Sequence, residues 1–246
     1  MKPQIFIIAL TAALSGCDDP QGPIAYTPEM ASFSNEFDFD PLRGPVKDFS
    51  QTLLNDHGEV TRRVSGTMSK EGCFDTLEFH DLDANTGAAL VLDANYYLEA
   101  GSQEKRVKLQ GKCQLAELPA IGLQYETDDN GFVVAARGKE ASVEYRYDEE
   151  GYPLGKKTQA KASTLDVKAT TTGDKRKKLN YQSVSLLDNK AISHATQVCK
   201  YDDYFNPVSC TLDVTDERTR APRRRLCIIS PSKTPLSITN PRACRG

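Results

Sequence analysis

The chain has 246 residues, a formal net charge of −3 and 26% charged residues. A charge so close to neutral indicates neither a nucleic-acid footprint nor a trap for acidic substrates. Nothing in the composition points to a cofactor or to a small-molecule ligand.

The first 16 residues are typical of a secretory signal peptide that is removed by cleavage. Met1-Lys2 gives a basic start, the stretch 5–14 is apolar, and the small residues Ser15 and Gly16 precede the expected cut. The apolar part is too short to span a hydrocarbon core of about 30 Å, and no later segment approaches that length.

The cysteine after the signal peptide predicts a lipid anchor. The run Leu14-Ser15-Gly16-Cys17 resembles the lipobox of bacterial lipoproteins. That resemblance implies that Cys17 becomes S-diacylglycerol cysteine and N-palmitoyl cysteine. Because two or more acyl chains hold a protein stably at a bilayer, Cys17 would fix the chain to a membrane.

The two acidic residues that follow predict the membrane in which the protein is retained. In enterobacterial lipoproteins an Asp directly after the lipidated Cys marks retention in the inner membrane, and Asp18-Asp19 resembles that sorting signal. The expected location is therefore the periplasmic side of the inner membrane. The expected partners are the membrane itself and an unknown envelope protein or component.

Residues 17–45 are expected to form an extended tether that begins at the lipidated Cys17. Proline keeps such a segment unhelical, and it recurs here five times after Asp19. Phe33, Phe37 and Phe39 are expected to dock on the folded domain, with a partner protein as the alternative.

Residues 46–217 are expected to form one β domain. Apolar and polar residues alternate in short runs such as 77–80 and 143–147, which is the pattern of a sheet with one wet face. We therefore expect an all-β fold, an antiparallel meander of hairpins that forms an open curved sheet or a barrel-like wrap. A two-sheet sandwich is the alternative.

Four turns share one signature, in which Asp or Asn stands three residues before Gly or Asn. The first residue is expected to cap a type I turn, and the last to take the left-handed conformation that closes a bulged hairpin. The turns are 55–58, 128–131, 148–151 and 203–206.

Four cysteines lie in the expected β domain. An even set in an exported protein indicates disulfides, because the periplasm is oxidising. Of the three possible connectivities we favour Cys73–Cys113 with Cys199–Cys210, since the second pair brackets a turn. A metal site is the alternative, but the chain has three histidines and no Cys-x-x-Cys spacing.

The last segment, 218–246, changes character. It contains no Asp or Glu, seven arginines and four prolines that are expected to break up any strand. We interpret it as a disordered or frameshifted end. A basic arm that binds a membrane or nucleic acid is the alternative.

Several stretches resemble the YnfC family of uncharacterised enterobacterial lipoproteins, and the resemblance extends to about Glu217. It implies a lipid-anchored membrane protein and no assigned activity, and the tail departs from the family's ending. The stretches are 33–49, Glu71-Gly72-Cys73-Phe74-Asp75, 90–97 and 111–119.

Two functional hypotheses follow. No nucleophile motif, phosphate-binding Gly loop or metal spacing is present, so the sequence favours a non-catalytic β domain used for binding or envelope structure. The alternative is a periplasmic hydrolase that acts on glycan or peptide through carboxylates that the sequence does not identify.

Overall fold

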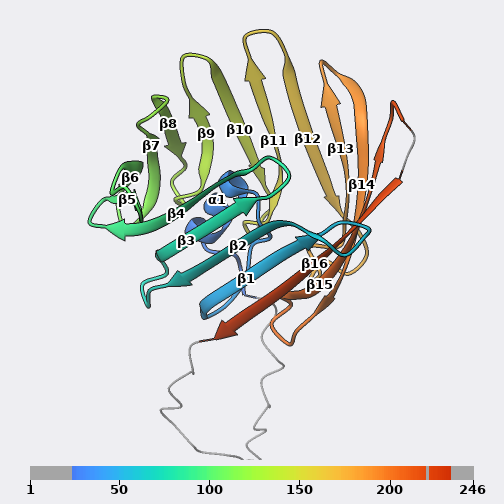
Figure 1. Cartoon of the computed structure of the whole chain (residues 1–246), viewed down its shortest axis with the longest axis horizontal. Coiled ribbons are helices and arrows are strands. Elements are labelled where there is room, and N and C mark those ends of the chain that lie inside the picture. The colour runs from blue at the N-terminus through green and yellow to red at the C-terminus, as the bar shows by residue number, and fades with distance from the viewer. Residues whose placement is uncertain (1–23, 220–221, 234–246) are drawn as a thin grey trace, which may run out of the picture.

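The computed structural model describes residues 24–219 and 222–233, which fold into one α-helix and sixteen β-strands. Each strand pairs antiparallel with the next, and the last pairs with the first, so the sheet closes into a barrel (Figure 1). The elements are α1 (Pro28–Phe37), β1 (Val46–Leu54), β2 (Val60–Met68), β3 (Phe74–Asp81), β4 (Thr86–Asp93), β5 (Tyr96–Glu99), β6 (Lys105–Gln110), β7 (Gln114–Leu118), β8 (Leu123–Thr127), β9 (Val133–Arg137), β10 (Ala141–Tyr147), β11 (Pro153–Ala160), β12 (Thr164–Thr171), β13 (Tyr181–Leu187), β14 (Lys190–Tyr201), β15 (Pro207–Asp216) and β16 (Pro222–Lys233).

The expected all-β meander is confirmed in its closed, barrel-like form. Consecutive hairpins account for every pairing except that of β1 with β16. In β3 and β9, buried and more exposed positions alternate along part of the strand, as the sequence pattern predicts. The barrel is closed by a pairing that joins the two ends of the described chain.

The closing strand lies in the segment that we interpret as a disordered or frameshifted end, and for residues 222–233 the expected disorder is wrong. Pro222 is tolerated because it is the first residue of β16. Pro231 lies beyond Ile228, where the pairing with β15 ends, and it pairs only with Phe49 of β1. On a strand segment with one neighbour, alternate N–H positions point away from that neighbour, so proline is tolerated there as on an edge strand. Residues 234–246 lie outside the described residues.

The turn chemistry is confirmed in three of the four predicted turns and is shifted in the fourth. Asp128 Oδ1 accepts hydrogen bonds from the backbone N–H groups of Asn130 and Phe132, and equivalent bonds form at Asn55 and Asp148. In the fourth turn the capping residue is Asp202 instead of Asp203. The left-handed residue is consequently Phe205, with φ of 59°, in the place that glycine takes in the other turns.

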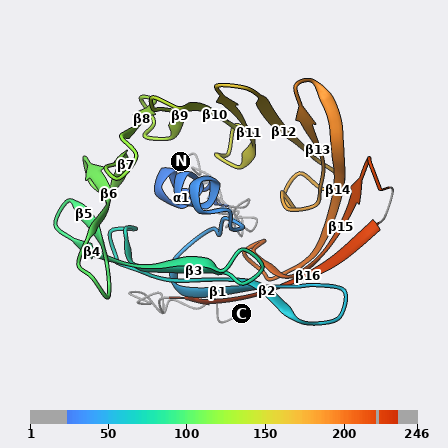
Figure 2. The ribbon, with the colours of Figure 1, turned by 45° about the horizontal axis from the view of Figure 1, so that its top comes forward.

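Helix α1 lies inside the ring of strands (Figure 2). The diameter of a barrel grows with its strand number, and sixteen strands enclose a lumen that the wall side chains alone do not fill. The Phe33 ring fills part of it, with its centroid 4.9 Å from that of Phe74 and 5.5 Å from that of Tyr97. The expectation that Phe33, Phe37 and Phe39 dock on their own domain is therefore confirmed, since all three have ring partners on the wall.

The expected tether is wrong for residues 24–45, because this segment forms the helix and packs within the barrel. Pro28 is the first helical residue, where its missing N–H costs no hydrogen bond. The Thr27 hydroxyl accepts a hydrogen bond from the Met30 N–H at 3.2 Å, and Glu29 follows in the first turn. Thr27-Pro28-Glu29 is thus a helix start signal that the proline count concealed. Residues 17–23 lie outside the described residues.

Arg43, in the segment after α1, is tied to the turns that follow β10 and β14. Its side chain is 1% exposed, and its guanidinium lies 3.2 Å from Glu150 and 4.5 Å from the centre of the Tyr26 ring. The Asn206 side chain accepts from the Arg43 N–H at 2.6 Å and donates to the Arg43 carbonyl at 2.9 Å. These contacts hold the interior segment against the wall.

Candidate functional site

The barrel interior retains a cavity of about 390 Å³ beside the helix. One side is formed by the end of α1 and the segment after it, and the other by β1, β2 and β11–β16. Its volume falls in the range of small-molecule sites, which runs from about 300 to 1,000 Å³. The walls combine apolar side chains, among them Phe39, Val64 and Leu212, with polar side chains in similar number.

The polar groups come from strands that hydrogen bonding places in register. Tyr181, Gln197, Leu212 and Arg225 occupy directly opposite positions on β13, β14, β15 and β16. All four line the cavity. Because residues opposite each other in a sheet share a face, the pairing alone brings these side chains, distant in sequence, to one wall.

Asp40 reaches the cavity from the segment after α1. The Gln51 side chain holds its backbone, accepting from the Asp40 N–H at 2.9 Å and donating to the Asp40 carbonyl at 2.6 Å. Burial raises the pKa of the Asp40 carboxyl from 3.8 to about 6, although the Gln197 amide and the Cys227 thiol oppose the rise. A carboxyl with a pKa near 6 changes its charge close to neutral pH.

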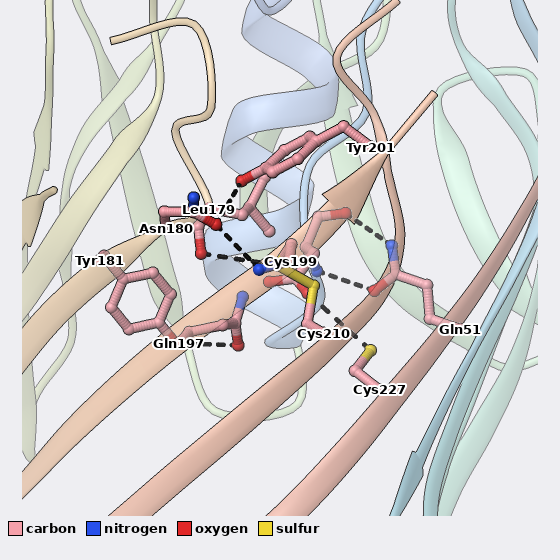
Figure 3. The surroundings of a disulfide bond; sticks show 10 residues. Gln51, Leu179, Asn180, Tyr181, Gln197, Cys199, Tyr201, Cys210 and Cys227 are labelled. Carbon is pink, nitrogen blue, oxygen red and sulfur yellow. Dashed lines mark hydrogen bonds between the residues drawn. A yellow bond between two sulfur atoms is a disulfide. The ribbon is translucent and has the colours of Figure 1, made fainter. Parts of the chain in front are cut away.

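A free thiol lies beside the second disulfide, at the edge of the same cavity. Cys210 is bonded to Cys199 on β14 and lies directly opposite Cys227 on β16 (Figure 3). The Cys227 sulfur is 3.9 Å from Asp40 Oδ2. Burial, together with the Asp40 carboxylate, raises the pKa of the Cys227 thiol far above its usual range, so the thiol stays protonated and a weak nucleophile.

Two amide groups on the cavity wall lack partners. Gln197 is 3% exposed and Asn35 is 9% exposed, and neither Gln197 Nε2 nor Asn35 Nδ2 meets a partner in hydrogen-bond geometry, although the Gln197 amide lies close enough to Asp40 to favour its carboxylate form. The amide oxygen of Gln197 accepts from the Tyr181 hydroxyl at 3.4 Å, so only its donor end is left over. Buried donors without partners are rare in folded proteins, and each calls for an acceptor.

The predicted disulfides Cys73–Cys113 and Cys199–Cys210 are both present. The predicted lipidation site Cys17 and the sorting residues Asp18 and Asp19 lie outside the described residues. Within the described part of the chain, no group of three or more His, Cys, Asp or Glu side chains is placed to hold a metal ion. No helix among the residues that the structure covers is long and apolar enough to cross a membrane.

Sequence reasoning missed the cavity residues Asp40, Gln197 and Arg225. The sequence pattern places Asp40 in the expected tether and Arg225 in the end interpreted as disordered or frameshifted. Gln197 gave no signal, because a polar residue on a strand is ordinarily a solvent-facing one. Strand pairing across β14–β16 reveals it, and that pairing is not visible in local sequence.

The closed antiparallel sheet, the interior helix and the two disulfides define the class as a disulfide-bonded β-barrel protein with an internal cavity. Residues 1–231 match the model of the family described as "Uncharacterised protein family (UPF0257)", and the chain belongs to that family.

Proteins named UPF0257 lipoprotein YnfC are similar to this chain. The protein from Salmonella typhi is 61% identical over 220 residues, which cover 89% of this chain and 93% of the relative. The protein from Salmonella typhimurium (strain LT2) is 60% identical over the same shares of both chains. The relatives' names agree with the lipoprotein class that the lipobox predicts.

Proposed function

We propose that this chain is a lipoprotein of the inner membrane, anchored through Cys17 on the periplasmic side, whose barrel binds a small envelope component in its interior. The single observation that carries the binding role is the 390 Å³ cavity, whose wall combines apolar side chains with unpartnered polar groups. Such cavities, in which a few polar groups orient a ligand, are typical of binding sites. The composition does not point to a small-molecule ligand, and the cavity is the reason to propose one.

The anchor and its address rest on the lipobox, on Asp18-Asp19 and on the lipoprotein naming of the relatives. Under this proposal Cys17→Ser releases the protein from membranes or leaves its signal peptide uncut. Asp18→Ser moves it to the outer membrane. Fractionation of inner and outer membranes, with immunodetection of the barrel, measures both. A protein that remains in the inner membrane after Asp18→Ser would contradict the sorting role.

The binding role is tested by blocking the cavity. Ala169 of β12 lines the cavity, and its neighbour Thr170 is exposed on the outer wall. Small molecules extracted from the purified full chain are compared by mass spectrometry among the wild type, Ala169→Phe and the matched control Thr170→Phe. We expect a compound that the wild type and Thr170→Phe retain and that Ala169→Phe loses. The same extract from all three folded proteins would count against the cavity as the binding site.

A further inference from the structure

The hydrogen-bonding inventory of the cavity wall separates satisfied from unsatisfied groups. Both ends of the Gln51 side-chain amide are hydrogen-bonded to the Asp40 backbone. Arg62 donates to the Asp38 carbonyl at 3.0 Å and lies 3.4 Å from Asp81. The Asp38 carboxylate, which lines the wall, pairs with Lys156 at 3.1 Å. These polar groups of the wall need no ligand.

Among the described residues of the wall, three side chains have hydrogen-bond donors without an acceptor. They are Gln197 Nε2, Asn35 Nδ2 and the guanidinium of Arg225, for which the described residues provide neither an ion pair nor a hydrogen bond. Arg225 differs in this from Arg224, its neighbour on β16, which faces outward and lies 2.7 Å from Asp213. An arginine keeps its charge at every physiological pH, and its planar fork suits carboxylate and phosphate.

The remainder of the wall is largely apolar. Leu212 stands between Gln197 and Arg225 in the register row, and Val167 and Phe39 line other parts of the cavity. Burying apolar surface against such a wall contributes roughly 0.8 kcal/mol per methylene group. A purely polar ion would leave this surface without a partner.

Building on the proposed function, we infer that the cavity takes an amphipathic anion, with one carboxylate or phosphate head on a short apolar body. The head binds Arg225 and Gln197, and the apolar body lies against Leu212, Val167 and Phe39. Among the described residues, two carboxylates line the wall; Asp38 is paired with Lys156, so Asp40 is the one that opposes such a head, because like charges repel. The neutral amide in its place would remove that repulsion.

The probes are decanoate and decyl phosphate, with decan-1-ol and acetate as controls that lack the charge or the chain. The full chain is held in phospholipid nanodiscs, and saturable binding of each carbon-14-labelled probe is measured by equilibrium dialysis after subtraction of empty nanodiscs. We expect one-to-one binding of at least one of the two anions, with decan-1-ol and acetate at least about ten times weaker. A charge-assisted hydrogen bond typically accounts for a ratio of that size.

Substitutions test whether probe binding depends on the side chains of the cavity wall. Arg225→Gln is expected to weaken binding of the anionic probe about ten-fold or more, while the matched outward control Arg224→Gln leaves it unchanged. Asp40→Asn is expected to tighten it, so a general loss of folding does not imitate the pattern.

Equal binding of decan-1-ol and the anions, unaffected by Arg225→Gln, would overturn the ligand class while leaving the cavity's binding role intact. No saturable binding of either anion would overturn the inference as well. The retention of a natural compound by the wild type but not by Ala169→Phe would then still support the proposed function, so the two failures are distinguishable.

Discussion

At the residue scale, Asp40 is a buried carboxyl whose ionisation lowers the free energy of unfolding. Its carboxyl lines the cavity, and burial raises its pKa to about 6. The folded protein therefore binds this proton more tightly than the unfolded chain does. The contribution of Asp40 to stability is fully present below its unfolded pKa of 3.8 and is lost as the pH rises through about 6.

We predict that Asp40→Asn stabilises the protein at pH 8 and has little effect at pH 4. Two pKa units correspond to about 3 kcal/mol, and partial exposure to the cavity reduces the expected gain to about 1–2 kcal/mol. Urea unfolding at both pH values measures it, with Asp129→Asn in an exposed turn as the control. An equal effect of Asp40→Asn at both pH values would show that the carboxyl is not desolvated.

Phe205 is a second case at the residue scale. It takes the left-handed conformation that glycine takes in the three related turns. The Asp202 side chain accepts hydrogen bonds from Tyr204 N–H and Asn206 N–H, and the guanidinium carbon of Arg176 lies 5.0 Å from the centre of the Phe205 ring. Side-chain contacts thus support a backbone conformation that the residue type disfavours.

At the scale of elements, α1 is a core element and not a linker. Six of its ten residues are buried, whereas a helix on a protein surface buries only one face. The helix is surrounded by the wall, so polar residues on it must find partners inside. Ser32 does so by accepting from the Val133 N–H at 3.1 Å, and the Glu36 carboxylate accepts from the Tyr145 hydroxyl at 2.6 Å.

We predict that Phe33→Ala lowers the free energy of unfolding by about 3–5 kcal/mol, because the ring is 1% exposed and its removal leaves a void beside Phe74 and Tyr97. Denaturant unfolding of the purified protein provides the measurement. Val198→Ala, a truncation on the outer wall at a side chain that is 58% exposed, serves as the control and should change stability by less than about 0.5 kcal/mol. Similar values for both would mean that α1 does not pack in the lumen.

At the scale of the whole molecule, β16 decides whether the sheet has edges. It pairs with β15 from Thr215 to Ser209 and with β1 along most of that strand. It also brings the buried residues Cys227 and Ile229 to the core. Without it, β1 and β15 would expose rows of unpaired backbone groups, which favour association with other chains.

We predict that a chain ending after Glu217 loses cooperative unfolding and forms oligomers, whereas a chain ending after Lys233 behaves like the full chain. The first end removes β16 and the second retains it. Size-exclusion chromatography with light scattering, together with thermal unfolding, compares the three chains. A monomeric, cooperatively folding chain that ends at Glu217 would show that the barrel does not depend on β16.

The sequence by itself determined the all-β class, three of the four turns and both disulfide pairs. Alternation of apolar and polar residues and capping of turns depend on residues close in sequence, and an even number of cysteines in an oxidising compartment favours disulfides. The tertiary structure decided the rest. Prolines near the N-terminus predicted a tether, yet Pro28 begins a helix once a lumen exists to bury Phe33. Arginines and prolines predicted a disordered end, yet residues 222–233 pair because β1 and β15 each offer an unpaired edge. The cavity residues Asp40, Gln197 and Arg225 come from three segments, and strand pairing across β14–β16 together with packing of the segment after α1 brings them to one cavity.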